Sequence, residues 1–432
     1  MAANPSIMQA VEQLHYRVTV GDVAAKAGKD LNVAQQGLLA LASDAGAHLQ
    51  VAESGEIVYQ FPENFRTILR NKFLRLRLQE WWQKTWKILF YLIRISFGLV
   101  LLTSIVLIFV AIAIILTTLN SSRDSNDSRS SDSGGGTIFI PYYWFGPDWF
   151  WVFYPDYDSP QYQYRRREKP QMNFLEAVFS FLFGDGNPNA NLEERRWQEI
   201  ATAIRNNGGA VVAEQIAPYL DNIGSGYSRE YEDYMLPVLA RFNGLPEVSP
   251  DGQIVYRFPD LQVTAAQHHP QVVPPYLQEL PWRFSAASSG QIILSAGLGA
   301  LNLVGALVLG NLLAGGTIAA KLGGLVALVQ SIYWLLLGYG IAFLAVPFIR
   351  YFWIQWRNGK IAFRNQQRQA RVMQLNQPSA DLQQKIAYAR QFAAETIIDR
   401  QDLAYTTETD LLEQEIERKD QIDDEWQRRL NN

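Results

Sequence analysis

Three long runs of apolar residues dominate the pattern along the chain, at 88–119, 290–314 and 325–349. Each run exceeds the roughly 20 residues that a helix needs to cross the hydrocarbon core of a bilayer. Only Arg94 interrupts the first run, near its start, and a short Gly-rich loop joins the last two. The pattern predicts one transmembrane helix followed later by a transmembrane hairpin.

A strand-like pattern occurs twice in the more polar parts of the chain. Residues 55–65 read GEIVYQFPENF and residues 252–262 read GQIVYRFPDLQ, so both contain G-[EQ]-I-V-Y-[QR]-F-P. The alternation is typical of a strand, the Gly suits a turn before it, and the Pro ends it. Helical patterns precede each copy, at 31–42 before the first and at 192–206, 211–220 and 229–242 before the second. Helices followed by a hairpin are typical of a winged helix, so we expect one small module used twice.

The fold class expected from these patterns is an α-rich membrane protein. It would hold two winged-helix-like (α+β) modules, about three transmembrane helices and a C-terminal helical tail, in which Leu382, Ile386, Ala389, Ala393 and Ile397 share one helical face. The expected order is winged-helix-like module 1 at 1–62, a basic amphipathic juxtamembrane helix at 63–87, transmembrane helix 1 at 88–119, a disordered Ser/Asp/Gly linker with an aromatic interfacial segment at 120–171, an amphipathic helix with winged-helix-like module 2 at 172–260, a Pro-rich connector at 261–289, the transmembrane hairpin at 290–349, and a basic juxtamembrane region with the helical tail at 350–432.

Tryptophans and cations gather beside the apolar runs, as expected for residues at a membrane interface. The candidate interface residues are Trp81, Trp82, Trp86, Arg75, Arg77, Lys84, Trp144, Trp149, Trp151, Trp353 and Trp356. In the run 290–314, the small residues Ala306, Gly310 and Ala314 lie four apart, a spacing that lets helices approach closely and would allow oligomers to form. Asn302, Asn311 and Gln330 are polar at membrane depth, where interhelical hydrogen bonds are their commoner use.

Composition argues against several classes of function. The chain has no Cys and only four His, so disulfides, thiolate metal sites and cysteine-ligated clusters are excluded. We find no P-loop, no G-x-S-x-G and no paired carboxylates at a catalytic spacing. We therefore expect no enzyme activity, no cofactor and no metal site.

Charge argues against nucleic acid as a partner, although winged helices often bind DNA. The net charge is −4, and residues 1–62 hold three basic and six acidic residues. The expected recognition helix at 31–42 offers only Asn32, Gln35 and Gln36 to a groove, without the cations that bind phosphates.

The distribution of basic residues does not by itself determine which side of the membrane each flank lies on. Basic residues precede the first apolar run and follow the last, which places both flanks on the cytoplasmic side. Three crossings would put them on opposite sides, so either the aromatic segment makes a re-entrant return or one basic flank is misleading. We favour both modules and the tail on the cytoplasmic side.

With its G-[EQ]-I-V-Y-[QR]-F-P repeat and the run VTVGDVAAKAG at 18–28, the chain resembles a cyanobacterial and chloroplast family of membrane proteins. Plant members are labelled "iron–sulfur cluster biosynthesis family protein". The resemblance implies a photosynthetic source and a plasma or thylakoid membrane.

The function expected is that of a non-enzymatic integral membrane protein. Its modules would recruit or organise protein partners at the membrane surface, in the assembly of membrane complexes. The alternatives are a membrane-tethered DNA-binding regulator, an auxiliary factor in iron–sulfur cluster biogenesis that does not itself ligate the cluster, and a small transporter or channel subunit.

Overall fold

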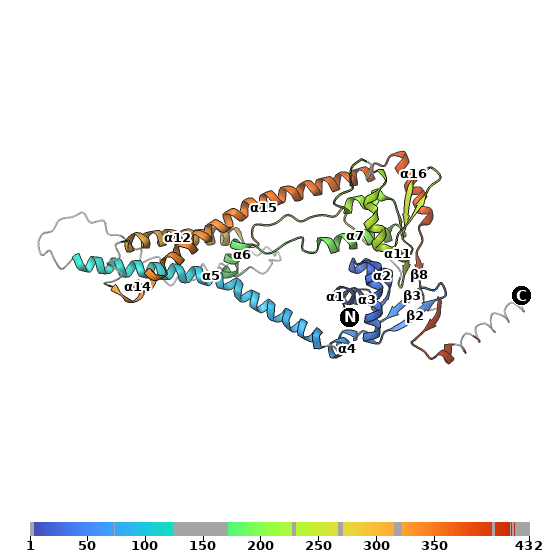
Figure 1. The fold of residues 1–432 in the computed structure, drawn as a ribbon, viewed down its shortest axis with the longest axis horizontal. Helices are drawn as coiled ribbons and strands as arrows, with labels where there is room; N and C mark the ends of the chain where they lie inside the picture. Colours follow the sequence, from blue (N-terminus) through green and yellow to red (C-terminus); the bar gives the residue numbers. More distant parts are fainter. Residues whose placement is uncertain are drawn as a thin grey trace, which may run out of the picture. The chain divides into compact units, whose positions relative to one another are not determined.

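A computed structural model describes residues 4–72, 74–123, 172–226, 230–266, 271–314, 322–399, 402–414, 416 and 419, without the side chains of 74–77, 79, 80 and 120–123. The chain is mostly helical, with small sheets (Figure 1). It forms two compact units. Unit 1 contains Met1–Trp81, Pro188–Pro281 and Gly359–Asn432, and unit 2 contains Trp82–Asn187 and Trp282–Asn358.

The first module of unit 1 begins with three helices that pack around one core. Its elements are α1 (Pro5–Gln13), β1 (Arg17–Thr19), α2 (Val20–Ala27), α3 (Leu31–Ala45), β2 (His48–Ala52), β3 (Ile57–Gln60) and α4 (Phe65–Lys72). Thr19 and Asp22 form a capping box at the start of α2, and Gly28 ends that helix with φ 59°. Phe65 and Leu69 of α4 are buried in the same core, which therefore extends past the expected boundary at residue 62.

The second module repeats this order with shorter helices. Its elements are α7 (Leu192–Asn206), β4 (Ala210–Val211), α8 (Ala213–Ile216), η3 (Ala217–Tyr219), η4 (Asp233–Met235), α10 (Leu236–Phe242), β5 (Leu245–Val248) and β6 (Ile254–Arg257), followed by α11 (Pro259–Gln262) and β7 (Val263–Thr264). The expected helix at 211–220 is instead a strand residue, a helical turn and a 3₁₀ turn. Pro218 lies inside that 3₁₀ turn, where its ring and missing N–H do not allow an α-helix to continue.

The two modules share one strand order and one register. The antiparallel sheets run β1-β3-β2 and β4-β6-β5. Tyr59 pairs with Val18 and Leu49, and Tyr256 pairs with Val211 and Pro246. The backbone bond from Phe61 to Tyr16 recurs as the bond from Phe258 to Gly209, both 2.8 Å. The sequence repeat is therefore a repeat of structure.

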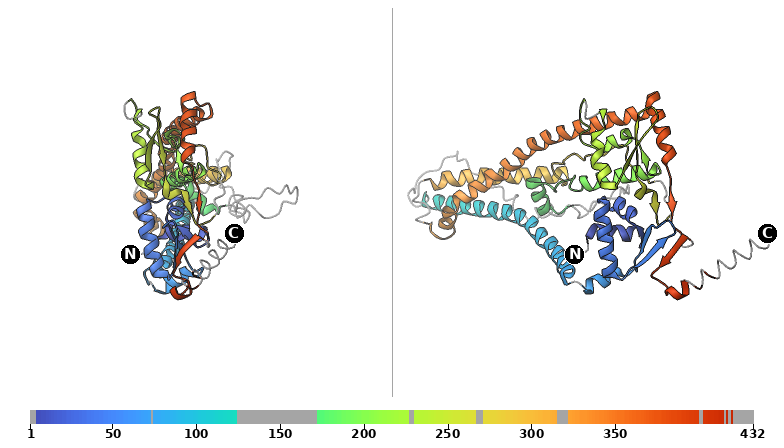
Figure 2. Two further views of the ribbon diagram at one scale, coloured as in Figure 1. Left: turned by 90° about the vertical axis from the view of Figure 1, so that its right-hand side faces the viewer. Right: turned by 45° about the vertical axis from the view of Figure 1, so that its right-hand side comes forward.

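The C-terminal segment differs from the expected helical tail. Helix α16 (Ala380–Ala389) and η5 (Arg390–Phe392) are followed by two strands, β8 (Thr396–Ile397) and β9 (Leu403–Thr406). Strand β9 lies beside β2 as the fourth strand of the first module's sheet, and β8 pairs in parallel with β7 (Figure 2). Ala393 and Ile397 therefore do not continue the helical face of Leu382, because the chain becomes extended before them.

Unit 2 is built from apolar helices. They are α5 (Leu74–Arg123), α6 (Phe174–Phe183), α12 (Ser289–Leu313), α14 (Gly324–Ser331) and α15 (Tyr333–Asn376), and α5 and α15 also contribute residues to unit 1. Three of them are long and apolar enough to cross a membrane: Trp81–Leu119, Ser289–Leu313 and Tyr333–Asn376. The expected helix at 325–349 is interrupted at Ile332, between α14 and α15.

The three long helices run between two distinct clusters of unit 2. At one end, Leu101 of α5 and Phe343 of α15 pack with α6 and with Ile292 near the start of α12. At the other end, Ile115 of α5, Leu313 of α12 and Leu336 of α15 pack together. Helices α5 and α12 therefore run away from the α6 end, and α15 runs back towards it.

Candidate functional site

Helix α2 of the first module is held at both ends by the second module. At its start, the Oδ2 atom of Asp22 accepts from the backbone amides of Thr19 and Ala265, both at 3.0 Å. The Oδ1 atom accepts from the Thr264 hydroxyl at 3.1 Å and from Arg205 of α7. Asp22 is only 4% exposed, so four donors replace the water that its carboxylate loses.

The last turn of α2 is capped by side chains of the second module. Gln198 donates to the carbonyl of Lys26 at 2.9 Å, and Arg241 donates to the carbonyl of Gly28 at 2.8 Å. The Arg241 guanidinium also lies 4.3 Å from the centroid of the Trp197 ring. A cation at the carbonyl end of a helix complements the helix dipole. The contacts at both ends join the two modules into one body.

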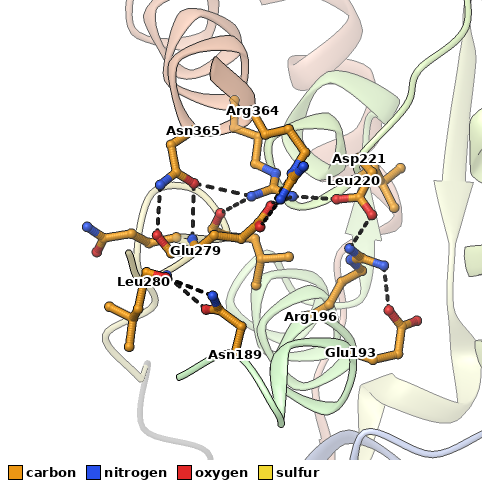
Figure 3. Close-up of polar contacts among 12 residues, drawn as sticks. Asn189, Glu193, Arg196, Leu220, Asp221, Glu279, Leu280, Arg364 and Asn365 are labelled. Atoms are coloured by element: carbon orange, nitrogen blue, oxygen red, sulfur yellow. Dashed lines mark hydrogen bonds and ion pairs between the residues drawn. The ribbon is translucent and has the colours of Figure 1, made fainter. Parts of the chain in front are cut away.

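A second polar cluster joins the end of α15 to the second module (Figure 3). Arg368 is 1% exposed and donates to Glu279 at 2.9 Å, to the carbonyl of Leu277 at 2.9 Å and to Asp221. Arg364 donates to both oxygens of the Glu279 carboxylate, and its Nε atom lies 2.7 Å from the Oε1 atom that Arg368 also contacts. Arg371 donates to the carbonyls of Ala217 and Leu220 at 2.8 and 2.7 Å.

The cations of this cluster stabilise its carboxylates in the charged form. Burial alone would raise the pKa of Glu279, but hydrogen bonds from Arg364 and the charge of Arg368 outweigh it and hold the pKa below 4.5. Burial acts in the same way on the pKa of Asp221, which Arg196 and Arg368 hold below 3.8. Both carboxylates of the cluster are therefore charged, and paired with arginines, at neutral pH.

Helix α16 is held on the second module by a buried lysine. The Nζ atom of Lys385 lies 3.0 Å from both oxygens of Glu214 and 2.5 Å from Glu232. The Tyr256 hydroxyl donates to Glu232 at 2.8 Å, and burial, reinforced by the charge of Glu232, raises the pKa of Tyr256. Tyr256, the tyrosine of the second sequence repeat, therefore holds the Glu232 carboxylate that binds Lys385 of α16.

Strand β9 completes the connection by contacting the first module. The backbone amide of Thr407 donates to the carbonyl of Leu49 at 2.9 Å, and the amide of Glu53 donates to the carbonyl of Asp402 at 2.9 Å. Arg17 of β1 donates to the carbonyl of Ile398 at 2.9 Å, just after β8. The C-terminal segment therefore contacts both modules in turn.

The exposed residues of α3 and β3 include large apolar side chains and no Lys or Arg. Val33 and Leu39 of α3 are 46% and 56% exposed, and Ile57 of β3 is 41% exposed. A groove of about 170 Å³ lies between α3 and the β2–β3 turn and is lined in part by Leu31, Ile57 and Glu56. A larger polar cleft of about 470 Å³ lies between α1, α2 and α7. Within the described residues, no group of three or more His, Asp or Glu is placed to hold a metal ion.

The expected membrane-interface residues are distributed along α5 and α15. Trp81, Trp82 and Trp86 are exposed, with the rings of the last two stacked at 6.4 Å, and Lys84 is exposed beside them. Arg75 and Arg77 lie in the same helix, with side chains outside the description. Trp353 and Trp356 are exposed on α15. Trp144, Trp149 and Trp151 lie outside the described residues, as does the expected linker and aromatic segment from residue 124 onward. Residues 120–123, expected to begin a disordered linker, are instead the end of helix α5.

Trp282 was not among the expected interface residues, although it contacts one of them. Its ring lies 5.4 Å from that of Trp353, and the Arg357 guanidinium lies over both rings, at 4.8 and 5.1 Å. The sequence offered only the position of Trp282 shortly before an apolar run.

The three expected helix-packing residues do not all lie in a helix–helix contact. Ala306 is fully buried, and a Cβ at Gly310 would lie 2.0 Å from the Tyr333 hydroxyl, but Ala314 is exposed just after α12 ends. Two glycines outside the expected set make close approaches: a Cβ at Gly299 would lie 2.4 Å from Phe343, and one at Gly305 would lie 3.0 Å from Ile108. Asn302 does form an interhelical hydrogen bond, accepting from Ser104 at 2.8 Å.

Comparison with known proteins gives one informative match. No family model matches the chain, and no solved structure matches it. An uncharacterised chloroplastic protein of Arabidopsis thaliana, At5g03900, is 37% identical over 437 residues, which cover 98% of this chain and 81% of the plant protein. The chain belongs to the family of this chloroplastic protein. The expected relation to a chloroplast family is confirmed to that extent, while the iron–sulfur label and the cyanobacterial source stay predictions.

Proposed function

We propose that this protein is a non-enzymatic membrane protein that recruits or organises protein partners at the membrane surface. Two modules would act as one body, joined by Asp22, Arg241 and the C-terminal segment. The observation that carries the proposal is the exposure of the large apolar side chains Val33, Leu39 and Ile57 on α3 and β3, two elements that hold no Lys or Arg. Assembly of membrane complexes in a photosynthetic membrane, plasma or thylakoid, is the setting we propose.

Both modules would lie on one side of the membrane, which we propose to be the cytoplasmic side. Support comes from unit 2, where Arg94 of α5 and Ser285 both contact the segment 180–185, and Arg350 of α15 donates to the carbonyl of Phe181 at 2.8 Å. The links of unit 2 to unit 1 therefore leave from the α6 end. Helices α5 and α12 both run away from that end, and α15 runs back towards it.

We propose that each module is a winged helix. The order of helices and strands in the first module, and the strand order β1-β3-β2 with the third strand in the middle, support this assignment. The equal register of β4-β6-β5 extends the argument to the second module.

A membrane-tethered DNA-binding regulator is a second candidate, favoured by the same order of elements. Two observations weigh against it. The exposed residues of α3 include Asn32, Gln35 and Gln36 but no Lys or Arg, and α2 is buried against the second module. A direct role in holding an iron–sulfur cluster has no support, because the chain has no Cys.

Site-specific cross-linking in native membranes tests the recruitment proposal. A photoreactive amino acid at Leu39, on the exposed face of α3, is expected to give discrete adducts with one or a few proteins. The same group at Gln377, an exposed position just after α15, serves as the matched control. Equal, diffuse labelling from both positions would contradict the proposal.

A further inference from the structure

The groove between α3 and the β2–β3 turn carries negative charge that nothing in its described lining neutralises. Glu56 and Asp260 both line it, together with Gln35 and apolar residues such as Leu31, Ile57 and Val263, and the lining holds no Lys, Arg or His. The Glu56 carboxylate has no hydrogen bond or ion pair in the part of the chain that the structure describes. The groove therefore has an apolar wall and an uncompensated acidic end.

The second module fixes the position of one of the two carboxylates. The start of α2 packs directly on the backbone of Asp260, since a Cβ at Gly21 would lie 2.0 Å from the Asp260 carbonyl oxygen. Asn243 donates to the Oδ2 atom of Asp260 at 3.0 Å, and the Oδ1 atom accepts no hydrogen bond from the residues that the structure describes. Asp260 is thus held in place by both modules before any partner arrives.

The two carboxylates interact electrostatically. The pKa of Glu56 is raised above 4.5, first by partial burial and then by the negative charge of Asp260. A cation placed between them would relieve this repulsion, whereas an anion or a nucleic-acid phosphate would increase it. The aliphatic stem of a lysine or arginine suits the apolar wall, because such side chains bury their stem and leave the charge at the polar end.

We propose that this groove binds a lysine or arginine side chain of a partner protein, flanked by apolar residues that pack on Ile57 and on the exposed face of α3. This inference rests on the proposed recruitment function and adds the chemistry of the partner to it. The groove is built from both modules, so a partner would recognise only the assembled body.

The test is a selection of peptides by the full chain in lipid nanodiscs. A library of random 12-residue peptides displayed on phage is the probe. Enriched peptides are expected to carry a Lys or Arg beside apolar residues, and a synthetic peptide with norleucine in place of that Lys or Arg is expected to bind about tenfold more weakly. Binding is also expected to weaken as ionic strength rises.

Variants of the chain assign the effect to the groove. The double variant Glu56→Gln with Asp260→Asn is expected to bind the selected peptide about tenfold more weakly. Glu53→Gln, in the same turn but outside the groove lining, is the control for general charge. An unchanged thermal midpoint shows that the variants are folded.

The results separate the two proposals. Two results would contradict binding in the groove but not the recruitment proposal. In the first, the enriched peptides carry no Lys or Arg. In the second, peptide binding is unchanged in the Glu56 and Asp260 variant but is lost on substitution elsewhere in unit 1. A library that yields no binder would also overturn the groove. The recruitment proposal fails separately, when the cross-linker at Leu39 finds no specific partner.

Discussion

Tyr59 and Tyr256 occupy equivalent positions in two sheets of identical register. The two sheets differ at the next strand, because β2 beside Tyr59 pairs with a further strand and, among the described residues, β5 beside Tyr256 does not. Leu49, opposite Tyr59, donates its backbone amide to the Thr407 hydroxyl at 2.8 Å. Pro246, opposite Tyr256, has no amide hydrogen to offer. Proline on an edge strand discourages further pairing. The C-terminal strand β9 therefore extends the first sheet, whereas the second sheet ends at β5.

The contact between Asp22 and Arg205 should contribute strongly to the stability of unit 1. Both oxygens of the Asp22 carboxylate accept hydrogen bonds. In Asp22→Asn, one of these oxygens is replaced by an NH₂ group, which would face two donors and leave them without an acceptor. We expect a loss of about 3 kcal/mol in the free energy of unfolding. Pulse proteolysis in urea on the purified full chain measures it.

The matched control for Asp22 is Glu12→Gln, which alters an ion pair with Arg66 on the surface of the same module. Because both of its side chains are partly exposed, the loss should stay below about 1 kcal/mol. Equal losses in the two variants would mean that Asp22 does not join the modules as described.

Acid should weaken the cluster around Arg368. The folded-state pKa values of Glu279 and Asp221 lie below their ordinary values of 4.5 and 3.8, so their contribution is fully present above those values. It is lost as the pH falls through the lower, folded-state values. Glu279→Gln should therefore cost about 3 kcal/mol at pH 7 and progressively less below about pH 4.5.

Urea-induced unfolding followed at pH 7 and pH 4 compares this variant with Glu247→Gln. Glu247 lies 3.8 Å from Arg257, and both side chains are about one third exposed. Its substitution should have a small effect that changes little with pH. A stability gap for Glu279→Gln that is the same at both pH values would contradict the cluster's role.

Much of the architecture could be predicted from the sequence because its signals are local. The G-[EQ]-I-V-Y-[QR]-F-P repeat indicated two copies of one unit, and the apolar runs indicated the three long helices. The strands β8 and β9 could not be predicted in this way. Residues 396 and 397 pair with Val263 and Thr264, and residues 403–406 pair with β2, more than 130 positions away. Helical periodicity at Leu382 carries no information about such partners.

The sequence predicts only part of the polar cluster around Arg368. Arg364, Arg368 and Arg371 follow one another at helical spacing on one face of α15, which is a visible pattern. All three fall in the segment 350–432, for which the sequence predicts a basic juxtamembrane region and a helical tail. Asp221 and Glu279, which bind Arg364 and Arg368, come from distant segments. The contact of Asp22 with Arg205 leaves no local signal in the sequence, because the two residues are 183 positions apart.

The strand β9 should protect the β2 edge from solvent exchange. Thr407→Pro removes the amide that donates to the Leu49 carbonyl. Hydrogen exchange at Leu49 and Glu53, whose amides donate to residues 407 and 402, is expected to rise while exchange in β6 stays unchanged. Unchanged protection at both amides would show that β9 does not pair in solution.

Close packing of α12 on α15 should depend on Gly299. A Cβ at Gly299 would lie 2.4 Å from Phe343, whereas a Cβ at Gly297 would meet no atom within 4 Å. Gly299→Val should lower the thermal midpoint of the protein in detergent by several degrees more than Gly297→Val, its matched control. Equal effects would mean that only helix propensity is being measured.

The central claim, that both modules lie on one side of the membrane, can be measured directly because the chain has no native Cys. Single cysteines at Ser54 and Asp251, in equivalent turns of the two modules, and at Glu408 in the C-terminal segment are all exposed positions. A membrane-impermeant maleimide is applied to right-side-out and inverted vesicles. We predict that all three positions are labelled in inverted vesicles only. Labelling of Ser54→Cys and Asp251→Cys from opposite faces would contradict the account.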